Sequence, residues 1–204
     1  MKKLFVGILW IVLSLSIQAK EVKMASPDGK YQFTLSDDGG QLHYSLEWDG
    51  KQLVKPSLLG INANAKWRDG LEIGTVSTSR QDTIWHPVYG ERSEIKDCFN
   101  AWKVVVNRQN ARDKIVLDVR AYNEGIAFRY HFPGGQYLKI TDEYTEYAMP
   151  EGTKAYFTPR AQTPYSYLPL ENWPGESDRP LLLTLSNGTY VCLAEAQAVD
   201  YVRT

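Results

Sequence analysis

Apolar and polar residues alternate along much of this chain, in short segments separated by turn-forming residues. The segments KYQFTLS (30–36) and QLHYSLEW (41–48) each carry an aromatic or aliphatic residue at every second position. Because successive side chains of a strand point to opposite faces, this period of two predicts half-buried β-strands. The dipeptide Asp49-Gly50 that follows is typical of a two-residue hairpin turn. These segments predict an antiparallel meander.

The same pattern continues towards the C-terminus. It predicts further strands at 102–108, 114–122, 125–133, 137–140, 145–149, 154–159, 180–185 and 190–196. Ser186, Asn187 and Gly188 form a second hairpin signal between the last two segments. No window after residue 19 shows helical periodicity. Many short strands at this spacing predict an all-β fold, either an antiparallel sandwich or a barrel.

The least regular stretch is RAQTPYSYLPLENWPGESDRP, residues 160–180, which contains four prolines. Its large aromatic residues Tyr165, Tyr167 and Trp173 are candidates for an exposed contact surface. Long segments of this kind are often functional loops, and they also serve as ordered crossovers between two sheets. The residues leave both interpretations open.

The N-terminus has the layout of a secretory signal peptide. Lys2 and Lys3 precede an apolar run from Leu4 to Leu15, and Ala19 stands at a plausible cleavage point. The apolar run is short for a membrane-spanning helix. We therefore expect a cleavable signal at residues 1–19, a single domain at 20–204, no stable membrane anchor, and export to the periplasm.

Charge and composition narrow the function classes. The whole chain has 23 basic and 24 acidic residues, and removal of Lys2 and Lys3 would widen the acidic excess. This balance argues against a nucleic-acid partner, which would require a basic surface. Thirteen Tyr and six Trp provide rings that stack on sugars but more commonly pack sandwich cores. Cys98 and Cys192 could pair in an oxidising compartment, although spacing alone does not decide it.

Motifs for catalysis or metal binding are scarce. His43, His86 and His131 lie far apart in sequence and share no ligand spacing, and no phosphate loop or nucleophile elbow is present. Acidic residues group in two segments, YGERSEIKD (89–97) and TDEYTEY (141–147). A glycosidase needs two carboxyl groups beside the scissile bond, but exposed acidic clusters are usually solvated edges.

Several longer blocks together resemble one known family. SPDGKYQFTL, LHYSLEWDGKQLVKPSLLGI, WHPVYGERSEIKDCFNAWKV, VRAYNEGIAFRYHFP, TDEYTEY and YVCLAEAQAVDY occur in the order seen in the N-terminal domain of glycoside hydrolase family 97. This family comprises bacterial α-glucosidases and α-galactosidases. The resemblance implies an antiparallel β-supersandwich of the galactose-mutarotase type, joined in the family to a catalytic (β/α)₈ barrel and a small C-terminal β domain.

The resemblance also implies roles for particular residues. The family's catalytic acid and base lie in the barrel, so no catalytic residue is assigned here and the chain alone is expected to be inactive. A calcium ion at the active site takes one glutamate from the N-terminal domain, and Glu195 in LAEAQAVDY matches that donor. Glu91 and Asn100 are weaker candidates for the substrate side. Arg129 in NEGIAFRY is expected to pair with Glu124 or another acid.

Two other function classes remain as alternatives. One is a stand-alone carbohydrate-binding or adhesion sandwich, and the other is an aldose epimerase, whose acid and base match no motif here. The sequence decides neither between glucosides and galactosides nor between inversion and retention, because that stereochemical outcome follows the separation of two carboxylates.

Overall fold

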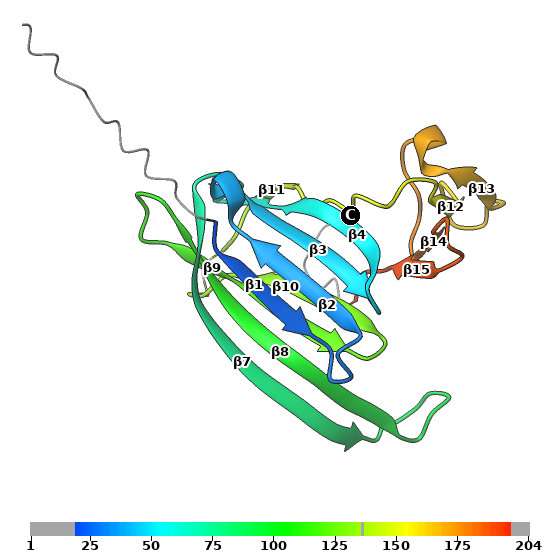
Figure 1. Cartoon of the computed structure of the whole chain (residues 1–204), viewed down its shortest axis with the longest axis horizontal. Helices are drawn as coiled ribbons and strands as arrows, with labels where there is room; N and C mark the ends of the chain where they lie inside the picture. Colours follow the sequence, from blue (N-terminus) through cyan, green and yellow to red (C-terminus); the bar gives the residue numbers. More distant parts are fainter. Residues whose placement is uncertain (1–18, 136, 197–204) are drawn as a thin grey trace, which may run out of the picture.

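The computed structural model describes residues 19–135 and 137–196, and this part folds almost entirely into antiparallel strands (Figure 1). The helical elements described are two short 3₁₀ turns, η1 (Asp38–Gly40) and η2 (Leu170–Asn172). The predicted all-β class is confirmed. The predicted signal peptide lies almost wholly outside the described residues. Within the described ranges, no helix has the length and apolar character needed to cross a membrane.

The first sheet is the predicted meander. It pairs, in order, β1 (Glu21–Ala25), β2 (Tyr31–Ser36), β3 (Leu42–Trp48) and β4 (Lys51–Leu59). Asp49 and Gly50 have φ values of 49° and 72°, so the β3–β4 turn has the positive φ at both centres that the sequence predicts.

The second sheet contains the longest strands. Its order is β10 (Gly125–His131), β9 (Lys114–Tyr122), β8 (Ile95–Arg108) and β7 (Leu71–Trp85). The hairpin of β7 and β8 extends beyond the first sheet at one end (Figure 1). On β10, Arg129 donates from Nε to Asp118 at 3.0 Å, so its partner is an acid of the neighbouring strand β9.

The two sheets face each other and enclose the core. Phe33 and Tyr44 of the first sheet stack with ring centroids 5.4 Å apart, and both contact Phe128 of the second sheet, at 6.1 and 5.6 Å. Val104 and Leu117 contribute fully buried side chains from the second sheet. Burial of this apolar surface is the main favourable term that holds the sandwich together.

A small three-stranded sheet and an extended segment lie next to β4, at the edge of the first sheet. The strands β5 (Ile61–Ala63), β6 (Ala65–Trp67) and β11 (Ile140–Glu143) pair in the order β11-β5-β6. Residues 144–148, the "edge segment", then run antiparallel to β4. Backbone bonds join Tyr144 N to Gly60 O, Glu146 N to Leu58 O and Lys55 N to Ala148 O. The strands predicted at 137–140 and 145–149 are therefore wrong as assigned strands, although 145–148 is extended and hydrogen-bonded.

The last four strands form a separate four-stranded sheet, the "C-terminal sheet". Its order is β13 (Ser166–Pro169), β12 (Lys154–Phe157), β14 (Leu181–Thr184) and β15 (Tyr190–Leu193). β13 lies inside the stretch predicted to be irregular. Trp173 is not part of an exposed surface as expected, because its ring packs edge-on against Phe157 at 5.4 Å.

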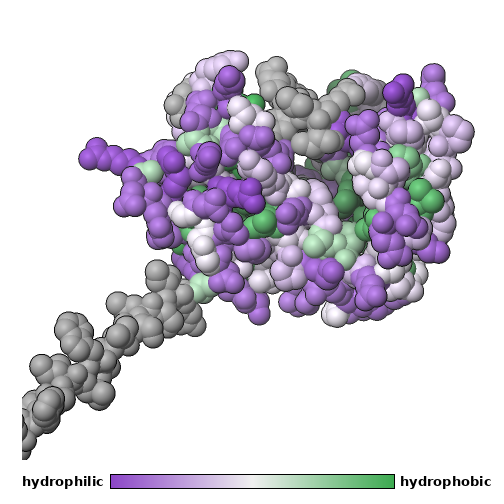
Figure 2. All heavy atoms as spheres, turned by 90° about the horizontal axis from the view of Figure 1, so that it is seen from above, coloured by the Kyte–Doolittle hydropathy of each residue, from purple (hydrophilic) through white to green (hydrophobic). Residues whose placement is uncertain are grey.

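In the space-filling view, apolar residues show in the gap between the sandwich and the C-terminal sheet and in small patches on either side of it, among mostly hydrophilic residues on this face (Figure 2). The two cysteines lie in different sheets, Cys98 in β8 and Cys192 in β15, and neither forms a disulfide.

Candidate functional site

Glu195 follows the end of β15, where the chain leaves the C-terminal sheet. Its Oε2 lies 2.6 Å from Nη1 of Arg179, which comes just before β14. Both side chains are only about one-quarter exposed, 25% for Glu195 and 24% for Arg179, although the backbone around Glu195 is exposed. Since β14 and β15 are paired neighbours, the hairpin brings the two charges together. The short distance and partial burial make this a charge-assisted contact that fixes the carboxylate.

Tyr147, in the edge segment, is electrostatically coupled to Glu143, at the end of β11, and to Glu195. Burial raises the pKa of Tyr147, and the negative charges of Glu143 and Glu195 raise it further. We use the name "junction cluster" for Arg179 and Glu195, which the ion pair joins, together with Tyr147 and Glu143 of the neighbouring chain segment, which the pKa of Tyr147 links to Glu195.

The edge segment is itself held in place by polar contacts. Glu143 accepts a hydrogen bond from Oγ1 of Thr145 at 2.6 Å, and Thr145 lies 3.3 Å from the hydroxyl of Tyr130. Glu146 accepts from the Leu58 backbone N–H at 3.2 Å. The acidic group TDEYTEY, interpreted as a solvated edge on base rates, therefore contributes bonds that position the junction cluster.

The donor set can be compared with what a calcium ion requires. Ca²⁺ takes six to eight hard oxygen ligands, and a single carboxylate supplies at most two of them. Among the described residues, no group of three or more His, Cys, Asp or Glu side chains could hold a metal ion. Glu195 fits the role of one oxygen donor, with Arg179 orienting its carboxylate. The described residues alone do not make a complete shell.

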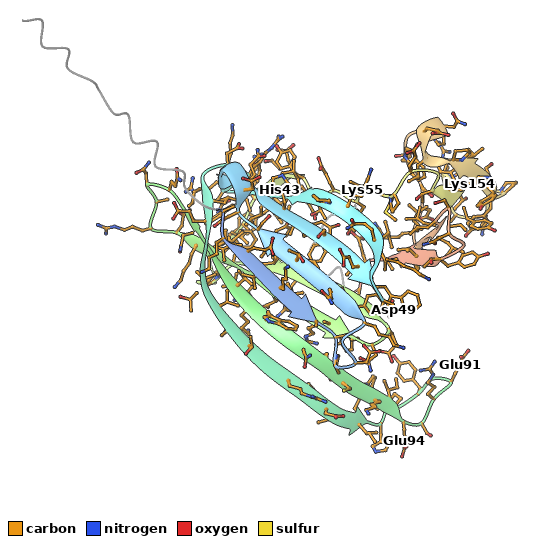
Figure 3. All side chains as sticks on the ribbon, in the orientation of Figure 1. His43, Asp49, Lys55, Glu91, Glu94 and Lys154 are labelled. Carbon is orange, nitrogen blue, oxygen red and sulfur yellow. The ribbon has the colours of Figure 1, made fainter. Side chains whose placement is uncertain are left out.

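The two weaker candidates lie on the second sheet rather than beside Glu195. Glu91 is an exposed residue of the loop between β7 and β8, and Figure 3 shows it with Glu94 at the outer tip of this hairpin. Asn100 lies in β8, where its Nδ2 donates to the Ala25 carbonyl oxygen at 2.9 Å. That bond ties β8 to the end of β1, so the Asn100 amide has a structural partner.

Sequence reasoning found Glu195 through the family motif but missed its neighbours. Arg179 and Tyr147 are distant from it in sequence; Arg179 belongs to no motif, and Tyr147 ends the family block TDEYTEY but has no assigned role there. Their approach depends on the β14–β15 pairing and on the edge segment following β4. The only sequence signal for these neighbours is the charged character of two segments, ESDRP with its arginine and TDEYTEY with its acids, and this signal is weak.

Comparison with known proteins places this chain in a family. Residues 24–204 match the family described as Glycosyl-hydrolase 97 N-terminal. A curated retaining alpha-galactosidase of Bacteroides thetaiotaomicron is 30% identical over 159 residues, which cover 76% of this chain and 23% of that protein.

Solved structures agree with this match. A Glycoside Hydrolase Family 97 enzyme of a Pseudoalteromonas species, in complex with panose, aligns with a TM-score of 0.82 and 26% identity over 88% of this chain and 29% of that one. The same enzyme in complex with acarbose gives the same values. A beta-arabinopyranosidase with 21% identity and a TM-score of 0.76 shares the fold, over 84% of this chain and 31% of that one. The chain thus spans less than a third of the length of these relatives. It belongs to glycoside hydrolase family 97, of which it is an N-terminal domain.

Proposed function

We propose that this chain is the N-terminal domain of an exported, calcium-dependent α-glycosidase that hydrolyses α-linked oligosaccharides. In this proposal the domain supports a catalytic (β/α)₈ barrel and gives it one calcium ligand, Glu195. Family membership supports the glycosidase role. The relatives, a retaining alpha-galactosidase and an enzyme in complex with panose and with acarbose, support an α-linked substrate. The signal-like N-terminus supports export.

The observation that carries the proposal is the ion pair of Glu195 and Arg179 at the junction cluster. Carboxylates that bind metals are usually held in one orientation by hydrogen bonds from an outer shell. Arg179, 2.6 Å from Oε2, holds the carboxylate in that way. When bound, a calcium ion would supply positive charge that orients sugar hydroxyls and stabilises charge developing in the reaction. Every other ligand oxygen would come from outside the described residues.

The test uses the full-length parent protein with Glu195→Gln. The amide is nearly isosteric, so we expect the fold to persist. Loss of an anionic donor should weaken calcium affinity by about tenfold or more, the scale seen when even an outer-shell partner of a metal ligand is removed. Calcium titrations by calorimetry, followed by activity at each calcium concentration, measure both effects.

Glu176→Gln is the matched control, because it neutralises an exposed acid of the loop that also carries Arg179. This variant should keep the wild-type calcium affinity. If Glu195→Gln and the wild type require the same calcium concentration, Glu195 is not a ligand and the proposed calcium role is wrong.

A further inference from the structure

The C-terminal sheet has one buried face and one face turned to solvent. Ala155, Phe157 and Leu183 point into the core, with exposures of 0, 8 and 1%. Residues paired directly across neighbouring antiparallel strands share a face. The pairs of Tyr156 with Tyr167, Tyr156 with Leu182 and Leu182 with Cys192 therefore place these four side chains on the opposite, "outer" face.

Aromatic rings on this outer face border a hollow. Tyr156 and Tyr167 stack with centroids 4.6 Å apart and an angle of 27° between their planes. Tyr156, Tyr165, Pro180 and Leu182 line the hollow, which has a volume of about 340 Å³. Tyr165 is 66% exposed and Leu182 is 37% exposed, so the described part of the chain leaves both side chains accessible to solvent.

The chemistry of the lining indicates the kind of ligand. Two phenol rings, a proline and a leucine surround the hollow, and the described lining contains no Asp, Glu, Lys, Arg or His. Aromatic faces bind apolar C–H surfaces, and phenol hydroxyls exchange hydrogen bonds with polar groups at the edge of a ligand. The volume falls near the lower end of the range for small-ligand sites. A pyranose ring has both properties, C–H groups on its faces and neutral hydroxyls around its rim.

We infer that the outer face of the C-terminal sheet binds a neutral oligosaccharide at a surface site, with one pyranose ring held between Tyr156 and Tyr165. Lys154 lies at the rim, its Nζ 5.3 Å from the centre of the Tyr167 ring, where it can donate to a hydroxyl of a neighbouring sugar (Figure 3). The site holds a glycan without cleaving it. It uses none of the junction cluster, so it goes beyond the proposed function.

The test measures glycan binding by the chain and by three variants at two tyrosines. The chain is run in native gels that contain soluble starch, and calorimetry with maltoheptaose and a β-1,4-linked galacto-oligosaccharide gives the affinity. Tyr165→Ala removes one wall of the hollow. Tyr190→Ala is the matched control, because Tyr190 is 63% exposed and lies on the same sheet but does not line the hollow.

We expect the wild type and Tyr190→Ala to bind at least one of these glycans with equal affinity. Tyr165→Ala should weaken binding by about tenfold, the loss of one aromatic contact. Tyr165→Phe should retain most of the affinity, since the ring face remains. Circular dichroism should show unchanged folding for all three variants, because both tyrosines are exposed.

Three results would overturn the inference. The first is that the wild type binds none of the glycans at millimolar concentration. The second is that Tyr165→Ala and Tyr190→Ala lose affinity equally. The third is that Tyr165→Ala changes the oligomeric state in gel filtration but not glycan binding, which would make this face a contact between protein chains. None of these results depends on calcium or on Glu195, so they leave the proposed function to its own test.

Discussion

At the scale of single residues, Tyr44 connects three parts of the fold. Its ring packs against Phe33 and Phe128, and its hydroxyl donates to the Glu146 carbonyl oxygen of the edge segment at 2.6 Å. Burial raises the pKa of Tyr44, and neighbouring Tyr147, Tyr130 and Glu146 raise it further. The neutral phenol is therefore the form that the folded protein stabilises.

This pKa shift predicts how stability depends on pH. An unfolded tyrosine ionises near pH 10, whereas folded Tyr44 keeps its proton above that pH. Its contribution to the free energy of unfolding should be complete below about pH 10 and should fall as the pH rises further. Tyr44→Phe removes the hydrogen bond of the hydroxyl, so its free energy of unfolding at pH 7 should be about 1 kcal/mol lower than that of the wild type. Above pH 10, the stability of this variant should decline less steeply.

Urea unfolding at pH 7 and at several values above pH 10 measures both effects. Burial also raises the pKa of Tyr130, so part of the alkaline decline should remain in the variant. Tyr89→Phe is the control, because Tyr89 is 90% exposed and its hydroxyl should not affect stability. An identical alkaline decline in wild type and Tyr44→Phe would contradict this account of Tyr44.

At the scale of elements, the sequence predicts the regular strands well and the edges poorly. Strands β2, β3, β9 and β10 follow from alternation, because one face of each packs on the core and the other does not. β13 is missed because Pro164 and Pro169 bracket a strand that pairs only with β12. For the site, Glu195 is predictable from a family motif, but Arg179 reaches it only through long-range pairing.

The edge segment depends on one serine of β4. Buried Ser57 accepts a hydrogen bond from the Ala148 N–H at 2.8 Å and donates one to the Lys55 carbonyl oxygen at 2.7 Å. Ser57→Ala removes the acceptor and leaves the half-buried Ala148 N–H without this partner. We expect a loss of about 1–3 kcal/mol in unfolding free energy and faster amide exchange at Ala148.

Hydrogen exchange followed by NMR resolves these amides individually. Exchange at the β9 amides in the middle of the second sheet should change only with global stability. Ser45→Ala on β3 is the matched control, since the described residues provide no hydrogen bond for the half-buried Ser45 hydroxyl. If Ala148 exchanges no faster in Ser57→Ala than in Ser45→Ala, the serine does not secure the edge segment.

At the scale of the whole molecule, the sandwich and the C-terminal sheet meet at the junction cluster. The charges of Glu143 and Glu195 both raise the pKa of Tyr147 there, after burial. Glycoside hydrolysis needs two carboxyl groups with different protonation, one as acid and one as base or nucleophile. The Arg179 guanidinium lies 2.6 Å from Oε2 of Glu195, so this carboxylate is already engaged in an ion pair. We therefore expect this neighbourhood to present a negative charge rather than to perform acid–base catalysis.

The chain by itself should therefore hydrolyse neither nitrophenyl α-glucoside nor nitrophenyl α-galactoside, with or without added calcium. The measurement is release of nitrophenol over many hours at high protein concentration. The Glu143→Gln and Glu195→Gln variants serve as controls for contaminating enzymes, because trace activity that survives both substitutions does not come from this cluster. Calcium-dependent turnover that disappears in either variant would show that the junction cluster performs the chemistry, and it would refute the assignment of catalysis to a separate barrel.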